Sequence, residues 1–372
     1  MSVTIHAAAS PGEIRLAVMR DGTLLDFSLW RPGAPDGVGD LHRGRVVASV
    51  PAMAGAFVAL ADAEGFLPDS EGARGLTVGT ILGVRVTRAA QGSKGPRLSA
   101  RLTPDDAALV GGAPVGLLRR GPDPAMRLAA RYPAASVLVN QPALAARLRP
   151  ALGARVTMVD TAFDDDVAEA VEALFHPLVT LPGGASLSIW PTPALVAIDI
   201  DAGAALPAGG GRRGVHEALN RAILPALAAQ IRLRDLSGGI VVDLAGLSAR
   251  KRVQLAPDLA AALADDPLRP KFLGFTALGL AEIVRARVHP PLHELLSGPH
   301  AAGLAALRAV VASLNLNPRA MPALKAAPSV VSALHADPVA LADLVRRTGR
   351  DLILRSDPSL PPCRWVLEQD HG

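Results

Sequence analysis

The sequence predicts an α+β protein of several domains, one of which is a small barrel of the OB type. Its 372 residues exceed the usual size of a single domain. Five short strand-like stretches follow one another between residues 35 and 102, punctuated by Gly, Pro and Ser, and this spacing is typical of a small β-barrel. Strand-like and helical stretches alternate through the rest of the chain, which favours sheets covered by helices.

Composition narrows the classes of protein to which the chain can belong. Half of the residues are hydrophobic, but only 3% are aromatic, so Ala, Leu and Val must do most of the packing. A net charge of +4 and a pI of about 9.8 suit an anionic partner. The single cysteine, Cys363, excludes an internal disulfide and a cysteine-cluster metal site. Because no leader-like or membrane-length apolar run occurs, we expect a cytoplasmic protein with no membrane partner.

The N-terminal part is expected to form strands around the barrel segment. The first 34 residues alternate in a strand-like way, with a hairpin turn at Asp21-Gly22. SVLVNQ (136–141) and RVTMVD (155–160) are further strands. DDDVAEAVEALF (164–175) starts with acids, as the helix dipole prefers. The barrel strands are expected at RGRVVASV, GAFVALA, GFLP, ILGVRVTRAA and RLSARL.

The second half is expected to begin with a hairpin that leads into LVAIDIDAG (195–203). A helix over 217–236 follows, with a kink at Pro225, and the preceding AGGGRRG (208–214) is expected to be a loop. LAEIVRARV (280–288) is predicted as a short basic helix.

Three carboxylates are candidate metal ligands. Strand side chains alternate between faces, so Asp199 and Asp201 should point the same way, and Asp243 ends another strongly apolar run. If these segments are buried and their ends meet, the acids repel one another, and a divalent cation such as Mg²⁺ resolves that repulsion. The alternative is that the acids cap loops or pair with arginines; the candidates are Arg232, Arg234 and Arg285.

A resemblance becomes specific at these acids. AAQIRLRDLSGGIVVDL (228–244) resembles the signature of the ribonuclease E/G family, in which an LRLRDLGG-like turn enters an IVIDF-like strand. The segment 181–203 is similar to the family's segment ending in IDVN or IDIN, and LGLAEIVRARV (278–288) resembles its FGLLEMSRQRL. HRGRVV, GAFVALADAEGFLP and QGSKGPRLSARL resemble its S1-type domain. TGRDLILRSDPSLPPCRWVL (348–367) resembles its small terminal domain.

The resemblance implies a division into domains. The expected parts are an RNase H-like scaffold (1–34 plus 135–177), an S1-type OB RNA-binding domain (35–102), a shortened 5′-sensor-like segment (103–134), a DNase I-like catalytic subdomain (178–290), a linker (291–325) and a small α/β domain (326–372).

The resemblance also implies an activity. Members of the family cut single-stranded, often A/U-rich RNA and leave a 5′-phosphate and a 3′-hydroxyl. Asp199 and Asp243 fall on the two positions that hold Mg²⁺, for which Mn²⁺ is an alternative ion. Asp201 stands where the family usually has Asn, as a catalytic helper. An extra carboxylate there should tighten metal binding and repel the phosphate.

RNA-binding residues are implied on the same grounds. Phe57 and Phe66 match the two aromatics of the S1-type domain, and Lys94 matches its basic residue; the alternative is that both Phe lie in the core. Arg43 and Arg45 either contact phosphate or are solvated surface charges. Arg120 stands at the Arg position of the family's 5′-monophosphate sensor, but Gly121 replaces its Thr, so a weakened sensor or a structural Arg is expected.

The zinc link of the family is missing from the expected segment. No cysteine lies in the segment directly after 278–288. His289, His293 and His300 do lie there, but prolines interrupt them, so no zinc is expected and the linker surface is the default. Homodimer formation stays open without that link. A catalytically weakened RNA-binding protein of the same fold is the alternative function, and a purely structural interaction module is a third reading.

Overall fold

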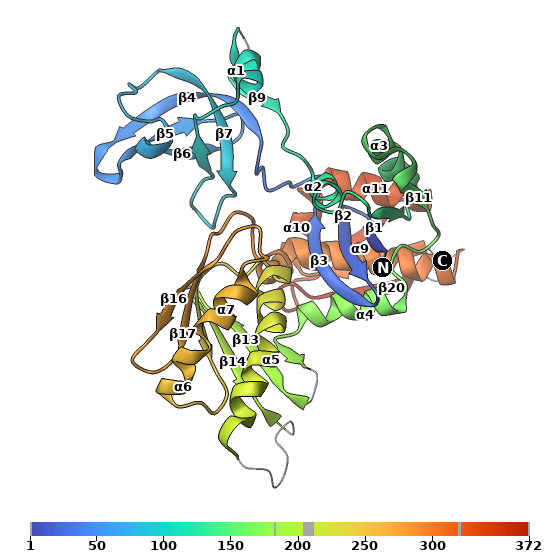
Figure 1. Ribbon diagram of the computed structural model, residues 1–372. Coiled ribbons are helices and arrows are strands. Elements are labelled where there is room, and N and C mark those ends of the chain that lie inside the picture. Colours follow the sequence, from blue (N-terminus) through green and yellow to red (C-terminus); the bar gives the residue numbers. More distant parts are fainter. Residues whose placement is uncertain (1, 113, 182–183, 204–211, 319–320, 371–372) are drawn as a thin grey trace. The chain divides into compact units, whose positions relative to one another are not determined.

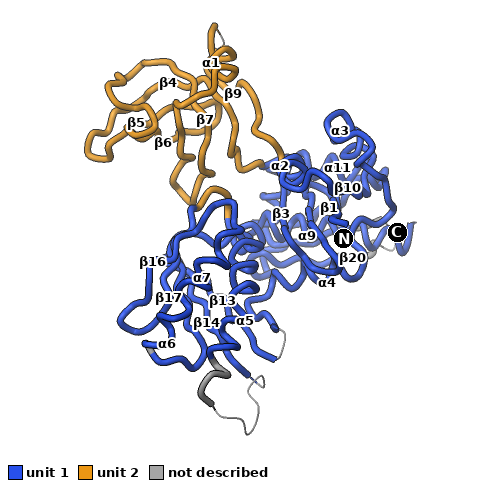
Figure 2. Tube along the Cα trace, viewed as in Figure 1, with its two compact units in different colours: residues 1–34, 124–286, 291–372 blue, residues 35–123, 287–290 orange. Residues whose placement is uncertain are grey.

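The fold divides into two compact units. A computed structural model describes residues 2–112, 114–181, 184–203, 212–318 and 321–370. Unit 1 comprises residues 1–34, 124–286 and 291–372, and unit 2 comprises 35–123 and 287–290 (Figure 2). The segment 103–134 does not form a part of its own but is shared between the two units.

Unit 1 begins with a five-stranded sheet in the order β11-β10-β1-β2-β3 (Figure 1). Asp21 and Gly22 have φ of 48° and 74°, which confirms the hairpin turn between the second and third strands. The first three strands are antiparallel, whereas β10 runs parallel to β1, and β11 parallel to β10. The strands are β1 (Val3–Ser10), β2 (Glu13–Arg20), β3 (Thr23–Trp30), β10 (Ser136–Val139) and β11 (Val156–Met158).

Helices cover both faces of this first sheet. One face packs against α2 and α3, and the other packs against the apolar side of α4. The helix predicted over 164–175 is amphipathic, and its apolar side buries Val167 and Val171 against strand residues such as Phe27. The elements are α2 (Pro124–Arg131), α3 (Pro142–Leu152), η3 (Gly153–Arg155), α4 (Asp165–Glu172) and η4 (Ala173–Phe175).

A second sheet of unit 1 carries the three candidate acids and is called the acid-bearing sheet. Its order is β12-β13-β14-β15-β17-β16, in which β14 and β15 are parallel and joined through α5. Its strands are β12 (Leu178–Thr180), β13 (Ser186–Pro191), β14 (Val196–Asp201), β15 (Gly238–Asp243), β16 (Lys271–Phe275) and β17 (Ala281–Arg285).

One face of the acid-bearing sheet is covered by α5 (Arg212–Leu233) and α7 (Ala256–Leu263) (Figure 1). Leu227 and Ile231 of α5 and Leu259 of α7 are fully buried in one cluster with the inward side chains of the strands. The short α6 (Ala249–Gln254) precedes α7. Of the glycine-rich stretch 208–214, residues 208–211 lie outside the described residues, and α5 starts at Arg212.

The prediction of a helix over 280–288 is wrong, because Ala281–Arg285 form strand β17 and the other residues of this segment are not helical. Ala281, Ile283 and Arg285 are buried, whereas Val284 is 44% exposed, so the burial alternates with the period of a strand. A short apolar run does not distinguish a strand from a helix by periodicity alone, and here pairing with β15 and β16 decides.

The C-terminal part of unit 1 is a three-stranded sheet with three helices. The strand order is β19-β18-β20, and α9, α10 and α11 contribute to one core with it. The segment 291–325, expected as a linker, instead holds α8 and the long α9, whose Leu304, Leu307 and Val310 are fully buried. The elements are α8 (Leu292–Leu295), α9 (Gly298–Leu316), β18 (Met321–Ala326), α10 (Pro328–His335), α11 (Pro338–Thr348), β19 (Ile353–Ser356) and β20 (Trp365–Asp370).

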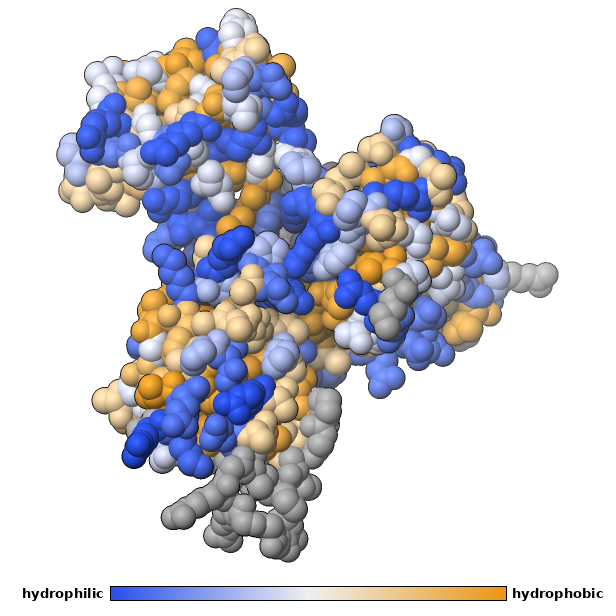
Figure 3. Space-filling model, in the orientation of Figure 1, coloured by the Kyte–Doolittle hydropathy of each residue, from blue (hydrophilic) through white to orange (hydrophobic). Residues whose placement is uncertain are grey.

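Unit 2 is a closed five-stranded barrel, consistent with the predicted OB type. Pairing runs β4-β5-β6-β8-β7 and returns to β4, while β9 adds to β4 on the outside of this circuit. Hydrophilic side chains form a band across the face of unit 2 seen in Figure 3. The elements are β4 (Leu41–Val50), η1 (Pro51–Met53), β5 (Gly55–Ala59), β6 (Glu64–Pro68), η2 (Asp69–Glu71), β7 (Ile81–Arg88), β8 (Arg97–Ser99), α1 (Pro104–Val110) and β9 (Gly116–Arg119).

None of the helices within the described residues is both long and apolar enough to cross a membrane.

Candidate functional site

Asp199 and Asp243 are direct neighbours on two parallel strands, and we call them the acid pair. The register of β14 and β15 sets Asp199 opposite Asp243, after Ile198 opposite Val242. In-register residues of paired strands point to the same face, and adjacent strands lie about 4.8 Å apart. The two carboxylates therefore leave the sheet side by side, at the carboxyl ends of both strands.

The acid pair lies on the open face of the sheet and not in its core. Ile198, Ile200 and Val242 are buried under the helices, whereas Asp199 is exposed and the Asp243 side chain is 51% exposed. The expectation of acids on a fully buried segment is thus corrected, because only one face of these strands is covered. Solvated carboxylates need no partner for stability, so any ligand at this face is not forced by burial.

Asp201 lies on this face, as the alternation predicted, but its carboxylate is hydrogen-bonded within the loop that follows β14. The strand β14 alternates between buried and exposed residues up to Asp201, which is exposed. Its Oδ1 accepts a hydrogen bond of 2.9 Å from the backbone N–H of Gly203. That bond caps the turn after β14, so one oxygen of Asp201 already has a partner.

Arg252 is a neighbour of the acid pair that the sequence did not reveal. Its Nη1 lies 3.1 Å from Asp243 Oδ1, and its side chain is only 14% exposed. The guanidinium group also donates to the backbone carbonyls of Leu247, at 2.9 Å, and Gly279. These contacts hold one positive charge beside the acid pair. They depend on the contact between α6 and the turn at Gly279, and no local sequence pattern predicts that contact.

The three arginines weighed earlier as partners of the acids are used elsewhere. Arg232 donates to the Leu25 carbonyl, and Arg285 is paired with Asp235 and Asp266. Arg234 donates to Gln230 and to a backbone carbonyl, and burial lowers its pKa to about 10. These contacts lie away from Asp243, whose neighbouring cation is Arg252.

The acid pair suits a hard divalent cation. Among the described residues no group of three or more His, Cys, Asp or Glu side chains converges in a way that could hold a metal. Mg²⁺ often keeps several waters and uses only one or two protein carboxylates. Two adjacent, solvated carboxylates match that donor set better than they match a closed zinc site.

Phe57 and Phe66 lie side by side on the barrel. They are cross-strand partners on β5 and β6, and their rings meet edge to face with centroids 5.5 Å apart. Both are half-buried and neither belongs to the buried core of the barrel, which Val46, Leu67 and Leu98 help to form. The alternative that both rings are core residues is therefore wrong.

A basic side chain continues this aromatic row on the next strand. Phe66 is paired with Arg97 on β8, and Arg97 is paired with Arg88 on β7. Burial, and then the charges of Arg97 and Arg287, lower the pKa of Arg88. A cluster of like charges of this kind attracts anions. Arg88 and Arg97 were not predicted from the sequence, although both flank the segment QGSKGP (91–96).

The other predicted RNA-binding residues of the barrel are at its surface. Lys94 is exposed in the turn between β7 and β8, where it bridges Gln91. Arg43 is half-buried and Arg45 is exposed, and both project outward from β4. These positions permit contact with phosphate, and they are equally compatible with solvated surface charges.

Arg120 has a structural partner. Its Nη1 lies 2.6 Å from Oδ2 of Asp40, whose side chain is 5% exposed, and Oδ1 of the same carboxylate accepts from the Gly121 N–H at 2.8 Å. A Cβ at Gly121 would lie 2.4 Å from the Val38 carbonyl oxygen, so no threonine fits there without a backbone shift. Close packing thus explains why glycine replaces the threonine expected from the resemblance.

The histidines after residue 288 take part in separate contacts. His289 Nδ1 lies 2.5 Å from Asp36 Oδ2, and His300 Nε2 lies 2.9 Å from Asp337 Oδ2. His293 lies in the short helix α8. We therefore find no histidine cluster in the described part of this segment.

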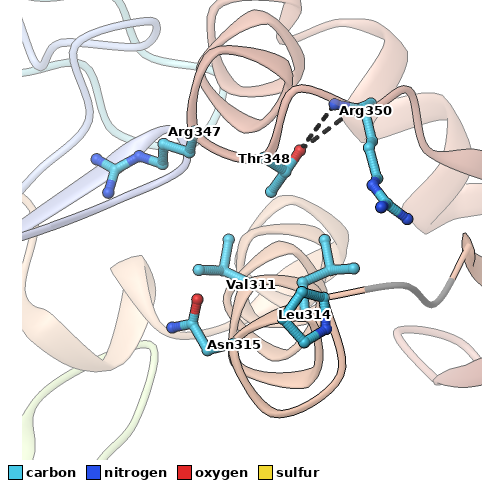
Figure 4. A pocket seen from close by; sticks show the side chains of 7 residues that line it. Val311, Leu314, Asn315, Arg347, Thr348 and Arg350 are labelled. Carbon is cyan, nitrogen blue, oxygen red and sulfur yellow. Dashed lines mark hydrogen bonds between the residues drawn. The ribbon is translucent and has the colours of Figure 1, made fainter.

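A pocket of about 410 Å³ opens between α9 and the end of α11 (Figure 4). Arg347 and Arg350 point to opposite sides of Thr348, so their charges do not converge on one ligand. Arg347 is already held by Asp343, at 3.2 Å, and by the Ala9 carbonyl, at 3.0 Å. We assign no function to this pocket.

The fold and the site together define a class: an α+β protein with an OB-like barrel and with an acid pair at the carboxyl ends of two central strands of a helix-covered sheet. The profile of the ribonuclease E/G family matches residues 140–288, which contain both acids. Ribonuclease E of Nostoc sp. is 34% identical over 127 residues, which are 34% of this chain and 18% of that protein. Ribonuclease G of Escherichia coli is 30% identical over 135 residues, 35% and 27% of the two chains.

A plant relative matches to a similar degree. The ribonuclease E/G-like chloroplastic protein of Arabidopsis thaliana is 32% identical over 145 residues, 37% of this chain and 14% of that protein. The chain thus aligns with between one seventh and about a quarter of the length of these relatives. Residues 140–288 are thus similar to the ribonuclease E/G family.

Proposed function

We propose that the protein is an endoribonuclease that cuts single-stranded, A/U-rich RNA with the help of Mg²⁺ or Mn²⁺. The observation that carries this proposal is the in-register acid pair on β14 and β15, within the segment that matches the family. Hydrolysis would join a water oxygen to phosphorus and break the bond to the 3′ oxygen. The products would be a 5′-phosphate and a 3′-hydroxyl.

Asp199 and Asp243 would hold the cation between neighbouring strand ends. When bound, Mg²⁺ supplies a water of lowered pKa and neutralises charge on the phosphate. Arg252, 3.1 Å from Asp243, would orient that carboxylate and add positive charge where the phosphate arrives. Asp201 would act as a polar helper through the oxygen that Gly203 does not occupy.

The barrel would bind the RNA strand. Phe57 and Phe66 would stack with unpaired bases. Arg88, Arg97, Lys94 and Arg43 would supply positive charge for the RNA backbone. Sensing of a 5′-monophosphate by Arg120 would be weak, because Asp40 already neutralises that guanidinium group. We also assign the sheet of β1–β3, β10 and β11 to the RNase H-like scaffold, and the acid-bearing sheet to the DNase I-like subdomain, from their places in the chain.

A cleavage assay tests the proposal. Wild-type protein should cut a 5′-labelled, A/U-rich single-stranded oligonucleotide with Mg²⁺ and not with EDTA. Asp199→Asn and Asp243→Asn should each lose at least about 100-fold in rate, because each removes a ligand of the cation. Asp160→Asn, an exposed acid outside the acid-bearing sheet, is the matched control. Unchanged cleavage by the two acid variants would remove the catalytic assignment.

A second candidate function is RNA binding with little turnover. The ion pair between Arg252 and Asp243 favours it, because a fixed guanidinium group competes with a metal for the same carboxylate. This candidate predicts RNA binding that persists in EDTA and no cleavage when Mg²⁺ is restored. Arg252→Gln would then strengthen cation binding and bring cleavage back.

A further inference from the structure

A tryptophan stands on the same face of the acid-bearing sheet as the acid pair. Trp190 lies near the end of β13, opposite Ala197 of β14, which precedes Asp199 by two residues. Cross-strand partners share a face, so Trp190, Ala197 and Asp199 all point away from α5 and α7. Strand geometry sets the Cα atoms of Trp190 and Asp199 roughly 8 Å apart.

The indole of Trp190 is free to bind a flat ligand. It is 58% exposed, and no ring or guanidinium group of the described residues stacks on it. Trp30 is the contrast, since it is 7% exposed and the guanidinium carbon of Arg147 lies 4.2 Å from its ring centroid. In a chain with 3% aromatic residues, one open indole beside an acid pair is a specific feature.

The row of strand partners through the acid pair changes from apolar to basic. Leu178, which is 58% exposed, pairs with Ser188, and Ser188 pairs with Asp199. Asp243 comes next, followed by Arg252. Trp190 adds to the apolar end from the adjoining row. A nucleotide has the same polarity, with a flat base at one side and an anionic phosphate at the other.

We infer that Trp190 forms a base-stacking subsite, which holds an unpaired base of the RNA next to the phosphate at the acid pair. This inference rests on the proposed function. Stacking on an indole accepts any base, because every base has a π-face. Bases inside a duplex have both faces covered by their neighbours, so the subsite selects single-stranded substrates.

Abasic scanning tests the subsite. The substrates are a labelled single-stranded RNA and a series in which one abasic nucleotide replaces each position around the cut. Trp190→Ala should raise KM and Kd for the intact RNA about tenfold to a hundredfold with little change in kcat. Trp190→Phe should restore most of the affinity. At one abasic position the wild type should lose the same affinity, and Trp190→Ala should lose nothing further.

The controls separate this inference from the proposed function. Val284 lies on β17, on the same face of the sheet, and is 44% exposed. Its partner on β15 is Gly239, four residues before Asp243. Val284→Ala should therefore keep the wild-type KM. Two results would overturn the subsite: wild-type affinity for RNA in Trp190→Ala, or a loss of RNA affinity in that variant that is equal at every abasic position. The catalytic assignment is tested separately by Asp199→Asn. Because the Kd for RNA is measured as well as the rate, binding tests the subsite even if the catalytic assignment fails. Tryptophan fluorescence that responds to protein dilution and not to RNA would assign Trp190 to a protein contact instead.

Discussion

Glu13 is a buried carboxylate held by three arginines. Its side chain is 2% exposed, and the guanidinium groups of Arg308, Arg15 and Arg31 lie 2.8 to 3.1 Å from its oxygens. Burial raises the pKa of Glu13, but these three charges outweigh it and bring the pKa below the usual 4.5. The ionised form therefore stabilises the fold above pH 4.5, and this contribution is lost as the pH falls through the lowered value.

Replacing Glu13 should destabilise unit 1. Glu13→Gln leaves the arginines without their shared counter-charge and should lower the free energy of unfolding by about 3 kcal/mol. Urea unfolding at pH 7, followed by circular dichroism, measures this loss. Glu64→Gln, at an exposed glutamate, is the control and should change little. Equal stability of the Glu13 and Glu64 variants would contradict the role of the cluster.

His42 should make the stability of the barrel depend on pH. Burial lowers its pKa below the usual 6.5, and the nearby charge of Arg120 adds to this while Asp40 and Asp62 oppose it. His42 therefore binds a proton more readily in the unfolded chain than in the folded barrel, so the stability of the barrel should fall as the pH drops below 6.5. Urea midpoints between pH 7.5 and 5.5 should decrease in the wild type and decrease less in His42→Leu. Parallel pH profiles would show that His42 is not the cause.

At the scale of elements, the alternation of β14 positions the acids. Ile198 and Ile200 bury one face under α5, and this leaves Asp199 and Asp201 on the other. The sequence predicted that shared face because strand period two is a local property. The register that joins Asp199 to Asp243 is not local, and the resemblance supplied that pairing. Arg252 was not predicted, since its contact depends on how α6 meets the turn at Gly279.

The helix α5 should be a main source of stability for the acid-bearing sheet. Leu227 is fully buried between α5 and the strands, so Leu227→Ala should cost about 2–5 kcal/mol through lost burial and a cavity. Leu273→Ala, on a side chain that is 61% exposed, should cost less than about 0.5 kcal/mol. Thermal unfolding compares the two, and similar losses would mean that the core is not organised around α5.

At the scale of the whole molecule, the chain forms two units, each with a hydrophobic core of its own. The barrel strands were predictable because they are short, regular and separated by turn residues. The helices in 291–325 were harder to foresee, since the prolines and histidines before α9 are typical of a linker. The return of residues 287–290 to unit 2 is a long-range feature that no local pattern in the chain announces.

The charge of the barrel should appear in the salt dependence of RNA binding. Arg97→Ala removes one cation beside Phe66 and should reduce the slope of log Kd against log salt by about one. Arg364→Ala, at an exposed arginine of the C-terminal part, should leave the slope unchanged. Fluorescence anisotropy over a range of KCl concentrations gives both slopes. An unaltered slope for Arg97→Ala would place the RNA backbone away from this row.

The shared cation is the claim on which the proposed chemistry depends, and Mn²⁺ binding followed by electron paramagnetic resonance tests it most directly. Wild-type protein should bind one Mn²⁺ that Mg²⁺ displaces. Asp199→Asn and Asp243→Asn should each abolish this binding, and the double variant should be no worse than either single one, because both acids serve one ion. Full Mn²⁺ binding in either single variant would contradict a cation held between residues 199 and 243.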